Sequence, residues 1–160
     1  MTIAPTAEIH GPCIIGEGSE IRHCAFIRGS ALIGKGCVVG NSTELKNCIL
    51  FDKTQVPHYN YVGDSILGKG SHLGASSVIS NLKSDGKDVC VNIDGERAST
   101  HRRKFGAILG DGADIGCGTV LNPGSIIGKG SRIYPHSTIR GTVPSGCIYK
   151  TDGEIVKIEK

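Results

Sequence analysis

The sequence predicts an all-β solenoid, because its aliphatic residues recur with a period of six and its aromatic residues are few. An aliphatic side chain stands at every sixth position from Ile3 to Leu45, and again from Leu109 to Ile139. Helices repeat every 3.6 residues and simple strands every two, whereas a solenoid of hexapeptides repeats every six. Aromatic residues make up 4% of the 160 residues, which suits a core of stacked aliphatic side chains. We therefore expect three hexapeptides, each a short strand with a corner, to close one triangular coil.

Two other positions of the hexapeptide support this prediction. A glycine follows many of the aliphatic residues, as in Ile15-Gly16 and Ile33-Gly34, and we expect it to take turn conformations that a Cβ would obstruct. Four positions after the aliphatic residue comes a small one, such as Ala25 or Thr43. The small residue is expected to fit beside the aliphatic interior near the corner.

The repeat breaks between the two regular runs. Between Leu45 and Val62 the register slips, and residues 81–107 carry no repeat. We expect 81–107 to be a loop ejected from the scaffold, with a small hairpin formed by Val89–Ile93 and a turn at Asp94-Gly95. Long loops of this kind are usually functional. The predicted organisation is a β-helix over residues 1–147 with this inserted loop, and a C-terminal tail or cap over 148–160 that covers the last coil.

Composition narrows the function. The net charge of +3 is small and dispersed, which disfavours a nucleic-acid partner, and the basic run Arg102-Arg103-Lys104 has no aromatic residues to stack bases. No apolar run approaches the roughly 20 residues of a membrane span, so we expect a cytoplasmic protein without a membrane partner. The seven cysteines are odd in number and form no Cys-x-x-Cys pair. They are interpreted as packing thiols in a reducing compartment.

The stretch from Val56 to Asp64 is the most reactive-looking part of the chain. Pro57 is expected to interrupt a strand ladder there, and His58 follows it at the register slip. Histidine titrates near neutrality, so His58 is a candidate general base, although a single histidine in a solenoid is more often a surface or corner residue. The other histidines share no spacing with it that would indicate one metal site.

The segment Val56-Pro57-His58-Tyr59-Asn60-Tyr61-Val62-Gly63-Asp64, with Leu73-Gly74-Ala75 and Asn81, resembles a known family. It is similar to the acetyltransferase half of the bacterial glucosamine-1-phosphate acetyltransferase/N-acetylglucosamine-1-phosphate uridylyltransferase. It more closely resembles the C-terminal domain of archaeal-type sugar-1-phosphate nucleotidylyltransferases with amino-sugar acetyltransferase activity, through motifs such as Asn81-Leu82-Lys83 and Asn122-Pro123-Gly124. The resemblance covers roughly residues 15–147.

This resemblance implies a left-handed parallel β-helix, a homotrimer with sites between subunits, and acetyl transfer from acetyl-CoA to an amino-sugar 1-phosphate without a metal. It makes His58 the catalytic base and Ala75 a contact of the thioester end of acetyl-CoA. The substrate-binding residues that it implies are Arg28, Lys46, Tyr61, His72, Asn81 and Lys87. Cys117, Arg140 and Lys150 are expected to bind acetyl-CoA, with Lys129 and Arg132 as further candidates for its phosphates.

Two departures and three alternatives stay open. His72 stands where the bacterial enzyme has an Asn that touches the sugar, and Cys90 where archaeal-type relatives have a loop lysine. No Gly-rich nucleotide loop in a βαβ setting occurs, so nucleotidylyl transfer is not expected from this chain. The alternatives are a non-catalytic sugar-phosphate-binding or regulatory trimer, a metal enzyme resembling the γ-class carbonic anhydrases, and an acetyltransferase for a different acceptor.

Overall fold

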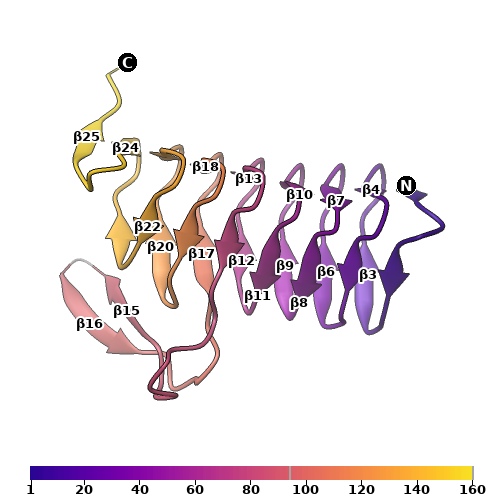
Figure 1. Cartoon of the computed structure of the whole chain (residues 1–160), viewed down its shortest axis with the longest axis horizontal. Coiled ribbons are helices and arrows are strands. Elements are labelled where there is room, and N and C mark those ends of the chain that lie inside the picture. The colour runs from indigo at the N-terminus through magenta and orange to yellow at the C-terminus, as the bar shows by residue number, and fades with distance from the viewer. Residues whose placement is uncertain (94, 160) are drawn as a thin grey trace.

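The structure is a left-handed parallel β-helix, which confirms the predicted fold class. The computed structural model describes residues 1–93 and 95–159, and within them the chain winds through coils that stack along one axis (Figure 1). Three sheets, named A, B and C here, form the three faces of the coil. Each strand pairs in parallel with the equivalent strand of the next coil, as Ile27 pairs with Leu45 and Ile33 with Leu50. The structure contains no helix long and apolar enough to cross a membrane in the residues it describes.

The strands are short and their order along each sheet follows the order of the coils. Sheet A contains β1 (Thr2–Ile3), β4 (Glu20–Ile21), β7 (Val38–Asn41), β10 (Gln55–His58), β13 (His72–Leu73), β18 (Asp114–Ile115), β21 (Arg132–Ile133), β24 (Cys147–Tyr149) and β25 (Ile155–Lys157). Sheet B contains β2 (Glu8–Ile9), β5 (Phe26–Ile27), β8 (Glu44–Lys46), β11 (Tyr61–Gly63), β14 (Val78–Ile79), β19 (Val120–Leu121) and β22 (Thr138–Ile139). Sheet C contains β3 (Cys13–Ile15), β6 (Ala31–Ile33), β9 (Cys48–Leu50), β12 (Ile66–Leu67), β17 (Ala107–Leu109), β20 (Ser125–Ile127) and β23 (Thr142–Val143).

The periodic aliphatic residues form the interior of the coils. From Ile21 to Ile139 they are almost completely buried, and the small residues four positions later, such as Ala25 and Thr43, are buried with them. The first coil is less buried: Ile9 and Ile15 are half-buried and Ile3 is 42% exposed, because no coil of these 160 residues stacks on its outer side. Most buried hydroxyls donate to backbone carbonyls, as Thr43 Oγ1 does to Val56 O at 2.9 Å, whereas the buried hydroxyl of Ser71 has no hydrogen-bond partner among the described residues.

The glycines after the aliphatic residues have a different role from the predicted one. Gly16 and Gly34 have negative φ, and the positive φ falls two residues later, at Gly18 and Gly36. A Cβ on Gly16 would lie 2.4 Å from the carbonyl carbon of Gly34 in the next coil. Glycine is needed after the aliphatic residue because neighbouring coils approach too closely there for a side chain.

The register slip corresponds to a shortened corner between sheets B and C. Leu50 follows Leu45 by five positions instead of six, and Leu67 follows Val62 by five, yet all four side chains are buried in the interior. The shorter corner also moves Cys48 into a buried position, where desolvation raises the pKa of its thiol to about 12.

The other cysteines are free as well, but they do not all pack as predicted. Cys37 and Cys147 are buried, whereas Cys24 and Cys117 lie exposed at corners between sheets A and B. The interpretation as packing thiols is therefore wrong for Cys24 and Cys117, because these corner positions face the solvent.

The proline expected to interrupt a ladder lies inside β10. Val56 pairs with Val39 and His58 with Asn41, so the ladder skips Pro57 and resumes beyond it. A Cβ on Gly40, in the preceding coil, would lie 1.6 Å from Pro57 O. The tight contact between these two backbones lets β10 continue to His58.

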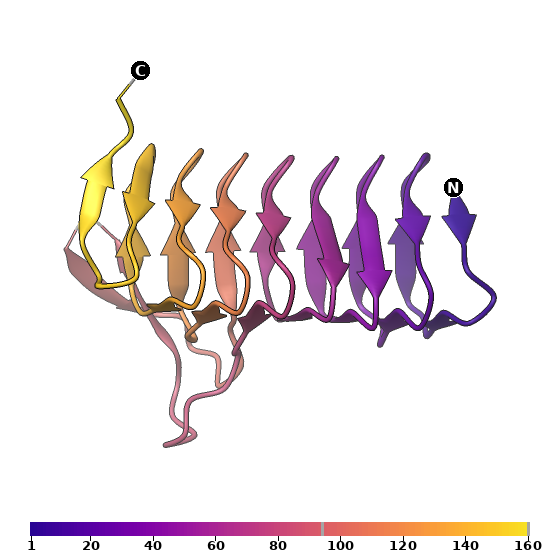
Figure 2. The same cartoon turned by 45° about the horizontal axis from the view of Figure 1, so that its top comes forward.

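The inserted segment leaves the β-helix after β14 of sheet B and returns to it at β17 of sheet C, so it replaces one corner between these sheets (Figure 2). It contains the predicted hairpin, with β15 (Cys90–Ile93) antiparallel to β16 (Glu96–Ser99), while Asp94 of the predicted turn lies outside the described residues. Strand β15 packs against β20 and β23 of the last coils (Figure 1). The insert is therefore attached to the C-terminal half of the solenoid.

The chain ends in a second antiparallel pair. Strand β24 pairs in parallel with β21 and antiparallel with β25, so the final strand reverses the direction of sheet A. We propose that this pair is the cap of the last coil, and the division of the chain at residue 147 stays a prediction.

The interior stacking can be tested by paired substitutions on β19. Replacing Leu121, which is fully buried, by Ala is expected to lower the free energy of unfolding by about 2–5 kcal/mol, because the close-packed interior cannot collapse around the lost atoms. The neighbouring Val120 points outward, and Val120→Ala is expected to cost much less. Urea unfolding of both variants measures the difference, and equal losses would contradict the alternation of inward and outward side chains.

Candidate functional site

The edge of sheet B that meets sheet C carries a line of polar residues at equivalent places in successive coils. Lys46 pairs with Gly63 across β8 and β11, and Arg28 extends β5 to the same level, where its N–H donates to Leu45 O. The line continues in later coils with Ser80, Asn122 and Arg140. Ser80 N donates to Leu121 O and Asn122 N donates to Ile139 O, while Arg140 directly follows β22 at the same level. The structure therefore places Arg28 and Lys46 at neighbouring positions of this edge, and Arg140 further along it.

Gly63 leaves a gap in this line, and two predicted site residues fill it. Asn81 Nδ2 donates to Tyr61 Oη at 3.2 Å. A Cβ on Gly63 would lie 2.6 Å from Tyr61 Oη and 2.7 Å from Asn81 Nδ2. Tyr61 and Asn81 meet beside Lys46 because position 63 has no side chain.

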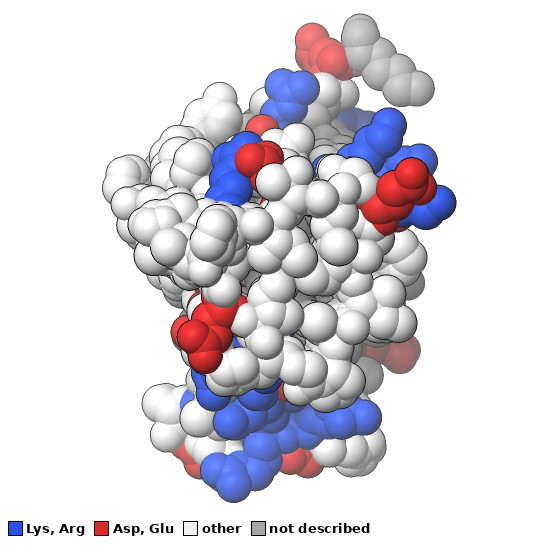
Figure 3. Space-filling view, turned by 90° about the vertical axis from the view of Figure 1, so that its right-hand side faces the viewer, with Lys and Arg blue, Asp and Glu red and all other residues white. Residues whose placement is uncertain are grey.

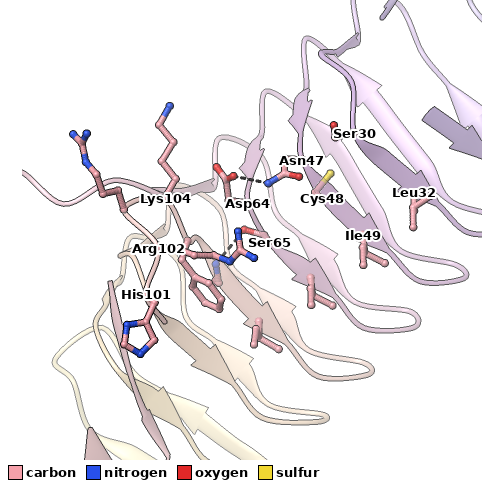
Figure 4. A pocket seen from close by; sticks show the side chains of 15 residues that line it. Ser30, Leu32, Asn47, Cys48, Ile49, Asp64, Ser65, His101, Arg102 and Lys104 are labelled. Atoms are coloured by element: carbon pink, nitrogen blue, oxygen red, sulfur yellow. Dashed lines mark hydrogen bonds between the residues drawn. The ribbon is translucent and has the colours of Figure 1, made fainter. Parts of the chain in front are cut away.

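Asp64 is the centre of the cluster, and sequence reasoning assigned it no role. Its side chain is only 8% exposed and accepts hydrogen bonds from Lys46 Nζ at 3.2 Å, from Asn47 Nδ2 at 2.7 Å and from Asn81 Nδ2. Figure 4 shows Asp64 and Asn47 side by side at the corner. The register slip in the sequence could have indicated Asp64, because the two shortened corners place Asn47 and Asp64 where the chain turns most sharply.

The local backbone explains the residue types at these corners. Asn47 and Asp64 have φ of 48° and 51°, in the left-handed region that Asn and Asp tolerate better than most residues. This conformation turns their side chains along the corner toward each other. The short corner therefore creates the contact between the two residues.

The environment of Asp64 favours its ionised form. Burial raises the pKa of the carboxyl group, but hydrogen bonds from Asn47, Asn81 and Lys46, with the charge of Lys46, outweigh burial and hold the pKa below its ordinary value. Arg28 has a carboxylate partner too, because its Nη1 lies 2.6 Å from Glu44 Oε1, and this contact raises the pKa of the guanidinium. Arg28 and Lys46 are thus each paired with one anion.

A groove opens from the cluster across sheet C. It has a volume of about 740 Å³, and its walls include Asn47, Asp64 and the returning segment of the insert with Arg102 and Lys104. That segment is fixed by two backbone hydrogen bonds, from Phe105 N to Asn81 O at 2.9 Å and from Gly106 N to Asp64 O at 2.8 Å. The insert therefore brings positive charge next to the cluster.

Positive charge is concentrated on the insert as a whole. Six of the 18 lysines and arginines lie in residues 81–107, namely Lys83, Lys87, Arg97, Arg102, Arg103 and Lys104. Figure 3 shows Lys and Arg gathered at the lower end of the molecule, the side on which the insert lies in Figure 1. The basic run thus borders the candidate site.

His58 is the last residue of β10 on sheet A, at the corner between sheets A and B, whereas the Asp64 cluster lies at the corner between sheets B and C. Its side chain is exposed, and its backbone N–H donates to Asn60 Oδ1 at 3.1 Å. The amide of Asn60 is buried and donates to Gly74 O and Ser77 O in the next coil. A buried polar residue therefore fixes the corner that carries His58.

Two residues predicted to contact acetyl-CoA share the corner position of His58. Ser76 N donates to His58 O at 3.0 Å, and Gly118 N donates to Ala75 O at 2.9 Å. His58, Ala75 and Cys117 consequently stand in one row on successive coils. Strand β11 joins this row to the cluster around Asp64, since it begins at Tyr61 and ends at Gly63.

The remaining predicted residues lie elsewhere. His72 is on sheet A, where its Nδ1 lies 2.8 Å from Asp114 Oδ1, and Lys150 is paired with Glu154 at 2.7 Å near the C-terminal strands. Lys87 lies in the insert, and its backbone N–H donates to Asp85. Arg140 lines a second cavity, of about 630 Å³, together with Lys83 and Arg97. Within one chain the structure brings none of these four residues to the Asp64 cluster.

The lowered pKa of Asp64 gives a prediction for stability. Because the folded pKa lies below the unfolded one, the carboxylate stabilises the fold above the unfolded pKa, and this contribution is lost as the pH falls through the folded pKa. Asp64→Asn is therefore expected to be less stable than the wild type near neutral pH, by a margin that shrinks below about pH 4. Urea unfolding across this range measures it, and a margin independent of pH would contradict the assignment.

The chain is similar to known proteins in sequence. Residues 9–102 match the family model described as the GMPPB C-terminal domain. The bifunctional protein GlmU of Methanococcus aeolicus is 35% identical over an alignment 177 positions long, which covers 99% of this chain and 43% of that protein. A bifunctional sugar-1-phosphate nucleotidylyltransferase/acetyltransferase of Sulfurisphaera tokodaii is 37% identical over 102 residues, covering 64% of this chain and 25% of the relative. The chain spans less than half the length of either relative.

A solved structure shares the fold over most of its length. AntD, an N-acyltransferase from Bacillus cereus in complex with dTDP-4-amino-4,6-dideoxyglucose and coenzyme A, superposes with a TM-score of 0.70 at 14% identity, covering 91% of this chain and 83% of AntD. At this identity the likeness concerns the fold alone. The family match, by contrast, covers more than half of the chain and includes His58, Tyr61, Asp64 and Asn81. The chain therefore belongs to the GMPPB C-terminal domain family.

Proposed function

We propose that the chain is an acetyl-CoA-dependent N-acetyltransferase that acts on an amino-sugar 1-phosphate, with His58 as general base. The observation that carries the proposal is the cluster of Lys46, Tyr61, Asp64 and Asn81, which lies on the same coil as His58 or next to it. The names of the bifunctional relatives support an acetyltransferase for a sugar phosphate. The same proposal assigns the chain to the cytoplasm and to the supply of UDP-N-acetylglucosamine.

The proposed reaction forms one amide and breaks one thioester. The amine nitrogen attacks the acetyl carbonyl carbon while His58 takes a proton from that nitrogen, and the C–S bond then breaks to release the thiolate of coenzyme A. The thiolate takes up a proton and leaves as the thiol. The backbone N–H of Ala75, next in the row after His58, is the donor that we assign to the developing oxyanion.

The substrate would bind across the outer face of sheet B. Lys46 and Arg28 are assigned to the phosphate as charge-assisted partners, and Tyr61 and Asn81 orient the sugar. Acetyl-CoA would pass along the row of His58, Ala75 and Cys117. Arg140 and Lys150 stay predictions for its phosphates, and His72 and Lys87 for contacts that a neighbouring subunit would bring together.

Sheet C offers a surface for assembly of the trimer. Its outward positions form one aliphatic column in register, made up of Ile14, Leu32, Ile49, Ile66, Ile108 and Ile126. Equivalent positions on sheet A include Glu20, His72 and Asp114, and sheet B carries Glu8 and Glu44. Ile14, Leu32 and Ile66 are exposed, while Ile126 lies on β20, against which β15 packs. Contiguous exposed apolar surface marks interaction sites. We assign this column to contact with further copies of the chain in a homotrimer.

The catalytic proposal predicts loss of turnover in His58→Ala. Release of the coenzyme A thiol is measured with glucosamine 1-phosphate and galactosamine 1-phosphate as acceptors. The variant is expected to lose at least about 100-fold in kcat, since general base catalysis contributes 10²–10⁴-fold. His23→Ala, in which an exposed histidine at the equivalent corner two coils before His58 is removed, is the control for a general effect of the substitution. Equal turnover in wild type and His58→Ala would contradict the assignment of the base.

The same assay decides between the proposal and its alternatives. Binding of the sugar phosphates without thiol release would favour a sugar-phosphate-binding or regulatory trimer. Thiol release only with another amine or hydroxyl compound would assign a different acceptor.

The assembly proposal predicts that a charge on sheet C dissociates the trimer. The wild type is expected to sediment with three times the 16.7 kDa mass of one chain. Ile66→Glu is expected to shift the mass toward that of a monomer, because a carboxylate would be buried without a partner in the interface. Gln55→Glu, an exposed position of sheet A, is the matched control. If the trimer withstands Ile66→Glu but dissociates with Gln55→Glu, the subunits associate through sheet A and the assignment of the interface to sheet C is wrong.

A further inference from the structure

The carboxylate of Asp64 contributes little to the shape of its own corner. The backbone there is held by hydrogen bonds from Asp64 N to Lys46 O at 3.0 Å and from Gly106 N to Asp64 O at 2.8 Å. The equivalent positions of the two preceding coils are Asn47 and Ser30, both with positive φ and neither with a carboxyl group. A corner of this kind therefore forms without a negative charge, and the nearly buried carboxylate calls for another explanation.

Asp64 determines which way the neighbouring amides point. An ionised carboxylate only accepts hydrogen bonds, so Asn47 and Asn81 both present their NH2 groups to it. The amide oxygen of Asn81 is consequently turned away from Asp64. An amide in place of the carboxylate would leave one acceptor oxygen for Lys46, Asn47 and Asn81 and would turn its own NH2 group toward one of these donors, which removes the reason for this orientation.

The orientation passes from Asn81 to Tyr61. Asn81 Nδ2 also donates to Tyr61 Oη, so the tyrosine oxygen accepts and its own proton is directed elsewhere. Lys46 is held by Asp64 on the other side of the cluster, with 26% of its side chain exposed. A ligand at this edge of sheet B therefore meets an O–H donor on Tyr61, an ammonium donor on Lys46 and a carbonyl acceptor on Asn81.

We propose that Asp64 is a positioning residue that fixes this pattern, and that the pattern selects a ligand with an anionic oxygen next to an N–H or O–H donor. This inference rests on the proposed function and adds how the site would recognise its sugar-phosphate substrate. In an amino-sugar 1-phosphate the phosphate oxygens would accept from Tyr61 and Lys46, and a hydroxyl or the amine would donate to Asn81. Asp64 touches neither the substrate nor the reacting atoms and acts through these three residues.

The test compares Asp64→Asn with a matched control, Asp111→Asn. The carboxylate of Asp111 also accepts one hydrogen bond, from Lys69 N at 2.8 Å, but it lies at the corner between sheets C and A. Asp64→Asn is expected to raise KM for the amino-sugar phosphate by about tenfold or more, since loss of one hydrogen bond to a charged group weakens binding by about this factor. KM for acetyl-CoA is expected to change less than about twofold in both variants.

A double variant separates positioning from stability. In Asp64→Asn with Asn81→Asp, the new amide at 64 can donate to the new carboxylate at 81, so the unfolding midpoint is expected to recover part of its loss. The carboxylate at 81 would accept the proton of Tyr61, so the donor for the ligand stays lost and KM stays raised. Recovery of KM together with stability would overturn the proposal, as would an unchanged KM in Asp64→Asn.

Calorimetric binding of glucosamine 1-phosphate tests the inference independently of turnover. If the wild type binds the sugar phosphate without releasing thiol, the acetyltransferase proposal fails, and the dissociation constants of wild type and Asp64→Asn still decide the role of Asp64. A dissociation constant about tenfold weaker in the variant supports positioning. Equal constants, or no binding by the wild type at all, overturn it.

Discussion

Close stacking of coils in register is the constraint on which the rest of the structure depends. Each coil donates its backbone hydrogen bonds to the next, so a residue type that fits one level must fit at the same place in every level. Interior positions are therefore aliphatic, and the residue after them is often glycine because the next coil lies too close for a Cβ, as at Gly16. A solenoid of this kind is rigid, and it repeats each outward position as a straight column.

The candidate site lies where the stacking rule is relaxed. Two successive corners between sheets B and C lose one residue each, and this brings Asn47 and Asp64 into contact in left-handed conformations. The insert begins one coil later at the same corner, and its returning segment is fixed to Asn81 and Asp64 through the backbone. Irregularity thus supplies the polar cluster, while the regular coils hold it in place.

The sequence predicted the repeating part of the structure well, because one physical rule applies to every coil. The aliphatic interior, the small residues, the inserted loop and its hairpin all follow from period and composition. The roles of the glycines were mistaken, since close approach between coils is a property of the stacked structure that one hexapeptide does not contain. Asp64 was missed for a similar reason, because its partners Lys46 and Asn81 lie 18 and 17 residues away in sequence.

The charge balance of the cluster bears on how it selects a ligand. Arg28 is paired with Glu44 and Lys46 with Asp64, so these four groups together carry no net charge. A site that bound phosphate through net charge alone would leave its cations unpaired and would attract any anion. Here each cation is held in one position by its carboxylate, at the cost of part of its attraction for a distant anion. Discrimination then depends on how the hydrogen-bond donors and acceptors of the ligand match those of Lys46, Tyr61 and Asn81, and the basic segment with Arg102 and Lys104 supplies positive charge from the rim.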